Sequence, residues 1–115
     1  MNHKELDVWK KSMDLVEQVY TISYLFPDTE KFGLTSQIRR AAVSVPSNIA
    51  EGAGRKGDKE FIQFLHIALG SLSELDTQYL IAVRLGFIEK NEIFEDLTND
   101  VKRLIIGFRN YLSNK

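Results

Sequence analysis

The sequence predicts an all-α fold, an antiparallel up-down four-helix bundle that forms a single domain over residues 1–115. Apolar residues recur at steps of three and four along most of the chain, and no run alternates between apolar and polar residues as a half-buried strand would. The length of 115 residues also suits one domain, because a chain of this size buries about two-thirds of its unfolded surface.

The first helix is expected over residues 7–26, before Pro27, and it has two apolar faces. One face consists of Leu6, Trp9, Met13, Val16, Tyr20 and Tyr24. The other face consists of Val8, Leu15, Val19, Ile22 and Phe26, and it lies roughly 110° around the helix axis from the first. A helix in a small bundle needs a single apolar face, so we assign the second face to an interface between subunits.

The second helix is expected over residues 35–54, with Thr35 or Ser36 as its N-cap, after a connector at residues 28–34. Its core face consists of Ile38, Ala42, Val45, Ile49 and Ala53. Pro46 lies within this range and is expected to kink the helix or divide it in two, because proline lacks a backbone N–H.

The third helix is expected over residues 58–86, with Asp58 as its N-cap and Gly86 as its stop. Its core face follows steps of four and three without interruption, through Phe61, Leu65, Ala68, Leu72, Leu75, Tyr79 and Ala82. Phe64 and Ile67 lie beside this face, and we assign them to the subunit interface as well.

The fourth helix is expected over residues 90–113. Its core face consists of Ile93, Leu97, Val101, Leu104, Phe108 and Tyr111. Four amphipathic helices with short connections are typical of an antiparallel bundle.

The composition excludes several classes of protein. The chain has no Cys, which excludes disulfide scaffolds, thiol catalysis and zinc sites with Cys ligands. No apolar run approaches the ~18 residues of a membrane span, and the N-terminal residues do not resemble a signal peptide. We therefore expect a cytoplasmic protein without membrane association.

The polar residues show no catalytic or metal-binding pattern. The two histidines, His3 and His66, have neither metal-ligand spacing nor a readable nucleophile motif around them. No Glu precedes a His by three positions, as a di-metal helical bundle requires. We expect neither enzymatic activity nor a cofactor.

The net charge is −1, but the charges are distributed unevenly. Residues 29–66 contain six basic and four acidic side chains, whereas residues 67–101 contain seven acidic and two basic ones. The candidate nucleic-acid contacts are Arg39, Arg40, Arg55, Lys56 and Lys59. Two interpretations stay open, namely contact with phosphate groups and an internal network of ion pairs. In the internal network, Glu51 would pair with Arg55, and Arg39 or Arg40 would pair with an acid elsewhere.

Residues 32–52, FGLTSQIRRAAVSVPSNIAEG, closely resemble the signature of the four-helix-bundle proteins encoded in intervening sequences of bacterial large-subunit ribosomal RNA genes. Residues 6–9, LDVW, and residues 59–78, KEFIQFLHIALGSLSELDTQ, are similar to the same family, so the resemblance covers nearly the whole chain. The family has no known catalytic activity or cofactor. It also resembles the accessory protein of diversity-generating retroelements, a homopentameric barrel that binds nucleic acid and a reverse transcriptase.

The resemblance implies a ring-like homo-oligomer, with a pentamer as the expected form. It also implies an adaptor that binds RNA or DNA, together with a protein partner such as a reverse transcriptase. Arg39, Arg40, Asn48, Glu51 and Gly52 match the family signature. The nucleic-acid-binding relative is markedly basic, whereas this chain is slightly acidic. A structural or protein-binding oligomer without affinity for nucleic acid is therefore the alternative function.

Overall fold

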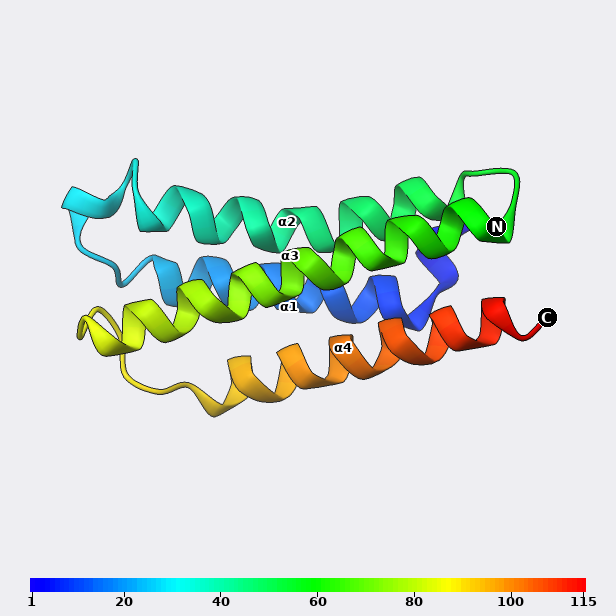
Figure 1. Ribbon diagram of the computed structural model, residues 1–115. Coiled ribbons are helices and arrows are strands. Elements are labelled where there is room, and N and C mark those ends of the chain that lie inside the picture. The colour runs from blue at the N-terminus through cyan, green and yellow to red at the C-terminus, as the bar shows by residue number, and fades with distance from the viewer.

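The computed structural model describes all of residues 1–115 and contains four α-helices and no strand. The helices are α1 (Asp7–Ser23), α2 (Leu34–Ala53), α3 (Asp58–Arg84) and α4 (Glu92–Ser113). Short 3-10 helices, η1 (His3–Glu5) and η2 (Asp28–Glu30), precede α1 and α2. Successive helices run antiparallel, so both termini lie at the same end of the molecule (Figure 1). The all-α prediction is confirmed.

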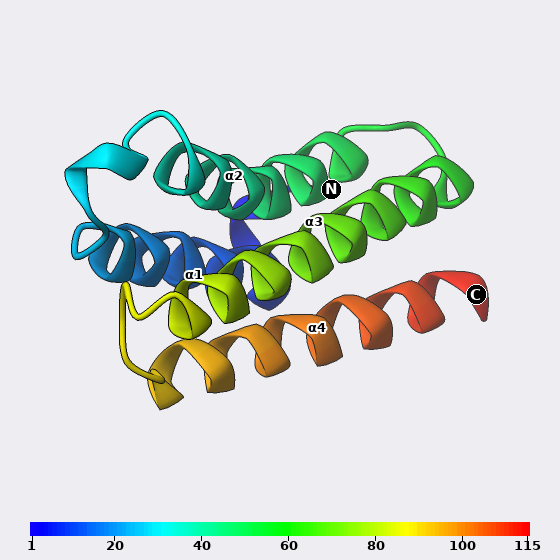
Figure 2. The same ribbon diagram turned by 60° about the vertical axis from the view of Figure 1, so that its left-hand side comes forward.

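The four helices form an elongated bundle, with dimensions of 46 × 25 × 20 Å (Figures 1 and 2). α2 packs against α1 and α3, and α4 packs against α3 and α1, which places the core between all four helices. The accessible surface of 7037 Å² exceeds the roughly 6,400 Å² expected for a monomer of this mass. The long, narrow shape therefore leaves extra surface exposed.

α2 packs tightly against α3 at Gly52. A Cβ atom at this position would lie 2.7 Å from Cδ1 of Phe61 and 2.8 Å from Cβ of Phe64. These separations are shorter than carbon atoms tolerate without a bond between them. Only glycine allows the end of α2 to pack this closely on the start of α3.

The start and the interior of α2 differ from the sequence prediction. The helix begins at Leu34, whose N–H donates to Oε1 of Glu30 at 3.1 Å, so the cap comes from η2 and not from Thr35 or Ser36. Pro46 does not divide the helix, which continues to Ala53 with Pro46 buried. Of the two effects predicted for Pro46, a kink or a division of the helix, the division is wrong.

The helix ends depend on local backbone turns. α1 ends at Ser23, three residues before the predicted Phe26, because the N–H groups of Leu25 and Phe26 bond to carbonyls three residues back. α3 ends at Arg84, just before the predicted stop at Gly86. Gly86 has a φ of +75°, a left-handed conformation that glycine adopts without strain.

The core takes the apolar face of α1 that was predicted for an interface, while Leu6, Trp9 and Val16 of the other face pack partly buried against it. The face assigned to a subunit interface lies in the core of the chain, where each side chain is at most 5% exposed: Val8, Leu15, Val19, Ile22 and Phe26. The other face carries Trp9, Tyr20 and Tyr24, of which both tyrosines are exposed. The assignment of those five residues to an interface is wrong. Aliphatic side chains fill a dry core well, whereas Trp and Tyr keep their polar atoms near water.

α4 is rotated relative to its prediction. Its buried residues are Phe94, Thr98, Val101, Ile105 and Leu112. Of the predicted core face only Val101 is buried, while Ile93, Leu104 and Tyr111 are exposed. α4 has apolar residues on two neighbouring faces, and periodicity alone did not distinguish them. Packing against α3 selects the face that carries Phe94.

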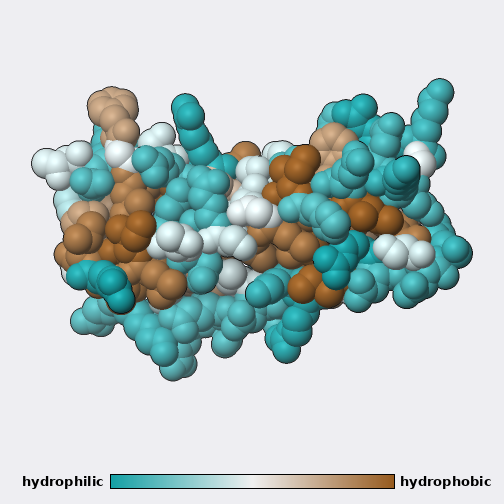
Figure 3. Space-filling model, viewed as in Figure 1, coloured by the Kyte–Doolittle hydropathy of each residue, from teal (hydrophilic) through white to brown (hydrophobic).

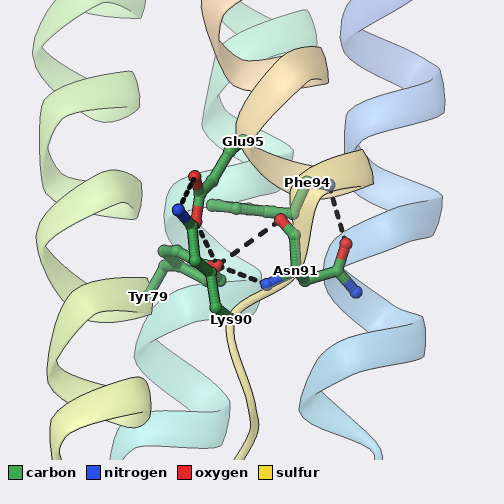
Figure 4. A network of polar contacts seen from close by, with 5 residues as sticks. All are labelled: Tyr79, Lys90, Asn91, Phe94 and Glu95. Atoms are coloured by element: carbon green, nitrogen blue, oxygen red, sulfur yellow. Dashed lines mark hydrogen bonds and ion pairs between the residues drawn. The ribbon is translucent and has the colours of Figure 1, made fainter.

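A buried tyrosine joins the end of α3 to the start of α4. Figure 4 shows the network of polar contacts around this tyrosine, while Figure 3 shows apolar side chains gathered in two areas of the molecule's visible face. The Tyr79 hydroxyl donates to Oε2 of Glu95 at 2.7 Å and accepts from the Asn91 N–H at 2.7 Å. Oδ1 of Asn91 accepts from the Phe94 N–H at 2.9 Å and so caps α4. The Phe94 and Tyr79 rings stack with their centroids 4.2 Å apart, which fixes the rotation of α4.

The surroundings of Tyr79 change its ionisation. Burial raises the pKa of the Tyr79 hydroxyl above its ordinary value of 10.0. The N–H of Asn91 lowers this pKa, while the hydrogen bond and the charge of Glu95 raise it. The neutral phenol is therefore the form that the folded protein stabilises.

Replacing Gly52 by Ala is expected to lower the free energy of unfolding by about 1–3 kcal/mol, because the new methyl group overlaps atoms of Phe61 and Phe64. Gly70→Ala is the matched control, since nothing lies within 4 Å of its Cβ position. Alanine there should stabilise α3 by about 1 kcal/mol. Urea denaturation followed by circular dichroism measures both values. Equal stability of the two variants would contradict the close contact at Gly52.

Replacing Tyr79 by Phe is expected to lower the free energy of unfolding by about 1–3 kcal/mol at neutral pH, because the Asn91 N–H loses its acceptor. The contribution of Tyr79 is fully present below pH about 10 and is lost as the pH rises from there through the raised pKa of the folded state. Urea denaturation at neutral and alkaline pH measures the free energy of unfolding of both proteins. This free energy should decrease with pH in the wild type, and the decrease should be smaller in Tyr79→Phe.

Tyr111→Phe is the control for this substitution, because the Tyr111 side chain is exposed and its hydroxyl forms no hydrogen bond within the chain. It should leave the free energy of unfolding unchanged within about 0.5 kcal/mol. If Tyr79→Phe behaved like Tyr111→Phe at every pH, the network would contribute nothing to the join between α3 and α4.

Candidate nucleic-acid interface

The five basic residues singled out in the sequence do not form one cluster. Arg39 and Arg40 lie in the first half of α2, whereas Arg55, Lys56 and Lys59 lie at and beyond its C-terminal end. A helical rise of 1.5 Å per residue separates Arg39 from Arg55 by about 24 Å. The structure therefore offers two basic surfaces at opposite ends of α2.

The charge of Arg55 is balanced within the chain. Its Nη2 atom lies 2.8 Å from Oε1 of Glu51, and its Nε atom lies 4.0 Å from Oε2 of Glu60. The guanidinium also covers the Phe64 ring, with its Cζ atom 4.9 Å from the ring centroid. The predicted ion pair between Glu51 and Arg55 is confirmed. Acidic neighbours thus reduce the positive potential at this end of α2.

Arg39 and Arg40 have no acidic partner. The five ion pairs of the chain all involve other side chains. Nε of Arg39 donates to Oγ of Ser23 at 2.9 Å, and its Cζ atom lies 4.6 Å from the centroid of the Tyr20 ring. Arg40 is exposed. The predicted pairing of one of these arginines with an acid is wrong, and both charges remain uncompensated.

The two arginines line a shallow hollow of about 570 Å³. It is bordered by α1, by the turn between η2 and α2, and by the first half of α2, and we call it the α1–α2 hollow. Its lining residues are Tyr20, Lys31, Phe32, Thr35, Ser36, Arg39, Arg40, Val43 and Ser44. Three of these are basic and none is acidic. Lys31 was not among the sequence candidates, because it lies in the connector and comes beside the arginines only in the folded chain.

Two aromatic side chains border the α1–α2 hollow. Phe32 is 90% exposed, and Tyr20 is 44% exposed. Nζ of Lys31 lies 5.6 Å from the centroid of the Phe32 ring. Phe32 lies in the predicted connector and Tyr20 on a predicted helix face, so neither was a candidate for binding. The fold brings both rings together with Lys31, Arg39 and Arg40.

A smaller cavity of about 230 Å³ lies between α3 and α4. It contains Asp76 and Lys102, whose charges have opposite sign, together with the polar side chains of Ser73 and Asn99. The acidic and basic groups nearly cancel, whereas the α1–α2 hollow carries positive charge only. The hollow is therefore the better site for an anionic ligand.

Part of the predicted subunit interface remains accessible. Ile67 is exposed on α3, while Phe64 is half-buried beneath Arg55. Ile81 and Leu85, near the C-terminal end of α3, are also exposed. Accessible apolar surface is thus provided by α3, by the tyrosine-rich face of α1 and by the exposed side of α4, and not by the core face of α1.

The histidines are isolated from one another. His3 packs edge-on against Trp9 with the ring centroids 5.2 Å apart, and His66 is exposed on α3. No three side chains of His, Cys, Asp or Glu lie close enough together to hold a metal ion. None of the helices combines the length and the apolar content that crossing a membrane requires.

Comparisons with known proteins agree with this architecture. The sequence model described as 23S rRNA-intervening sequence protein matches residues 4–107. A solved structure from Bacteroides thetaiotaomicron, a protein of unknown function from the S23 ribosomal protein family, superimposes with a TM-score of 0.77 at 23% identity. The alignment covers 89% of this chain and 97% of that chain, and at this identity it shows the fold alone. No curated protein gives a significant match. Because the family match spans most of the chain, the protein belongs to the 23S rRNA-intervening sequence protein family.

Proposed function

We propose that this protein is a non-enzymatic, self-associating adaptor that binds RNA or DNA through the α1–α2 hollow. The observation that supports this function is that Lys31, Arg39 and Arg40 line one hollow without any acidic partner. Cations that the chain itself does not neutralise are available to phosphate oxygens, which Arg binds with paired donors.

Hydroxyl groups add neutral donors to the same surface. Thr35 and Ser36 line the hollow in the first turn of α2, and neither hydroxyl forms a hydrogen bond within the chain. Arg39 is held in place by Ser23 and Tyr20, so it loses little side-chain freedom when it binds. Contacts of this kind recognise the phosphate backbone and do not distinguish base sequences.

Self-association is the second part of the proposal. α1 exposes Met13, Tyr20 and Tyr24 on one side of the chain, and α3 exposes Ile67 and Ile81 on another. Two different apolar faces favour head-to-tail contact between copies, which closes into a ring when the rotation allows it. The homopentameric relative named above makes a five-membered ring the expected form.

A ring would also compensate for the weak charge of a single chain. The net charge of −1 gives one subunit little general attraction for a polyanion. A ring repeats the α1–α2 hollow around one axis, so that several phosphates of one strand are contacted together. The alternative, a purely structural or protein-binding oligomer, uses the same apolar faces but gives the unpaired cations no role.

Changing Lys31, Arg39 and Arg40 together to Gln is expected to weaken binding of a fluorescein-labelled RNA by at least about tenfold, as measured by fluorescence anisotropy. The slope of log affinity against log salt should decrease by about 2, because three phosphate contacts to a single strand are lost. An unlabelled RNA of scrambled sequence should compete as well as the original.

The triple change of Arg55, Lys56 and Lys59 to Gln is the matched control, since it removes the same number of charges from the other basic surface. It should leave the affinity within about threefold of the wild type, because Glu51 and Glu60 already reduce the positive potential at this end of α2. A loss confined to this control would place the binding surface at the other end of α2. No binding by the wild type at low salt would refute the nucleic-acid function.

Changing Ile81 and Leu85 together to Lys is expected to convert the oligomer to a monomer of 13.2 kDa in light scattering, because both exposed side chains would place charges in the contact. Ile93→Lys, an equally exposed apolar side chain on α4, should leave the mass unchanged. Leu15→Asp should instead unfold the chain, because Leu15 is fully buried. A wild-type protein that is monomeric at micromolar concentration would contradict self-association.

A further inference from the structure

We infer that the α1–α2 hollow selects single-stranded over double-stranded nucleic acid, because Phe32 presents its ring to an unpaired base. This inference rests on the proposed function and specifies its substrate class. Phosphate groups are common to single strands and duplexes, so Lys31, Arg39 and Arg40 alone would not discriminate between them. Discrimination requires a group that contacts the faces of the bases, and the hollow contains such a group.

Hydrogen bonds hold the backbone on both sides of Phe32. It lies in the turn between η2 and α2, where the N–H of Lys31 bonds to the carbonyl of Asp28 at 3.1 Å. The N–H of Gly33 bonds to the carbonyl of Glu30 at 2.9 Å on the other side of Phe32. These bonds hold the backbone while the ring remains 90% exposed. When a ligand stacks on the ring, the ordering entropy is therefore limited to the two side-chain torsions of Phe32.

Phe32 is better suited to stacking than the other ring of the hollow. The guanidinium of Arg39 already lies over Tyr20, at 4.6 Å from the ring centroid, and Tyr20 is less than half exposed. The Phe32 ring has only the flexible ammonium of Lys31 beside it, at 5.6 Å. That arrangement suits one nucleotide, whose base stacks on Phe32 while its phosphate contacts Lys31.

A duplex cannot stack a base on Phe32 without losing stacking energy of its own. Its base faces are covered by the neighbouring pairs, so an aromatic ring reaches them only by unstacking a base step. In a single strand the bases swing out freely and stack on exposed aromatic side chains, without regard to sequence. The cations of the hollow therefore supply affinity for both forms, and Phe32 supplies the preference for the single strand.

The test compares three fluorescein-labelled DNA probes of equal length by anisotropy: a single strand, its duplex, and a strand of abasic residues with the same phosphates. The wild type should bind the single strand roughly five- to a hundredfold more tightly than the abasic strand. Phe32→Leu keeps an apolar side chain but has no aromatic face, and it should remove this difference while leaving duplex affinity unchanged. Tyr111→Leu, which changes an exposed ring on α4, is the matched control and should retain the difference.

Phe32→Trp provides a direct signal of stacking. This variant should keep the preference for the single strand, and its additional Trp fluorescence should be quenched by the single strand but not by the abasic strand. Circular dichroism checks that each variant keeps the wild-type helix content, as expected for a side chain on the surface.

The outcomes separate this inference from the proposed function. The wild type could bind the three probes with equal affinity, and the triple change of Lys31, Arg39 and Arg40 to Gln could weaken all three. This result would overturn the preference for single strands but leave the nucleic-acid function intact. Tighter binding of the duplex, or a Phe32→Leu variant that retains the preference, would overturn the inference as well. No binding of these DNA probes and none of the labelled RNA at low salt would overturn the proposed function, and the inference with it.

Discussion

The close packing of α2 on α3 at Gly52 is the constraint on which the other features of the molecule depend. With no side chain at this position, the end of α2 lies directly against Phe61 and Phe64. This contact, together with the uninterrupted core faces of both helices, determines which side of α2 is buried. The opposite side must then face α1 and solvent, which is where Arg39 and Arg40 lie. A structural requirement for one glycine thus determines where the basic side chains of the same helix can act.

The remaining two helices fit around this pair by a choice between alternative faces. α1 and α4 each carry two apolar faces. In α1 the core takes the mainly aliphatic face, whereas in α4 it takes the face that carries Phe94. The Tyr79 network then holds α4 in this rotation, because the cap at Asn91 and the stacked Phe94 ring fit together only in one orientation. The rejected face of α1 stays outside and leaves apolar surface for contact between copies. The same choice that completes the core therefore also creates the surface for assembly.

Charge pairing distinguishes the two basic surfaces more clearly than their composition does. At the C-terminal end of α2, Arg55 forms ion pairs with Glu51 and Glu60, which compensate its charge within the chain. At the other end, Arg39 contacts only a hydroxyl and an aromatic ring, neither of which neutralises it. Unpaired cations next to an exposed Phe32 combine the two interactions, with phosphate and with a base face, that nonspecific binding of single strands uses. Net charge, which is −1 for the chain, conceals this local arrangement.

The sequence by itself determined the helices and the core faces of α2 and α3, because on each of them one apolar face follows steps of three and four over nearly the whole helix. It also determined the ion pair between Glu51 and Arg55, since residues four apart on one helix are neighbours whatever the fold. Only the tertiary structure decided which faces of α1 and α4 enter the core, because a helix with two apolar faces satisfies the periodicity in either rotation. Only the tertiary structure brought Tyr20, Lys31 and Phe32 together with Arg39 and Arg40. Tyr20 lies on a different helix from the arginines and its distance from them is set by how α1 packs against α2, a property that no local pattern of residues contains.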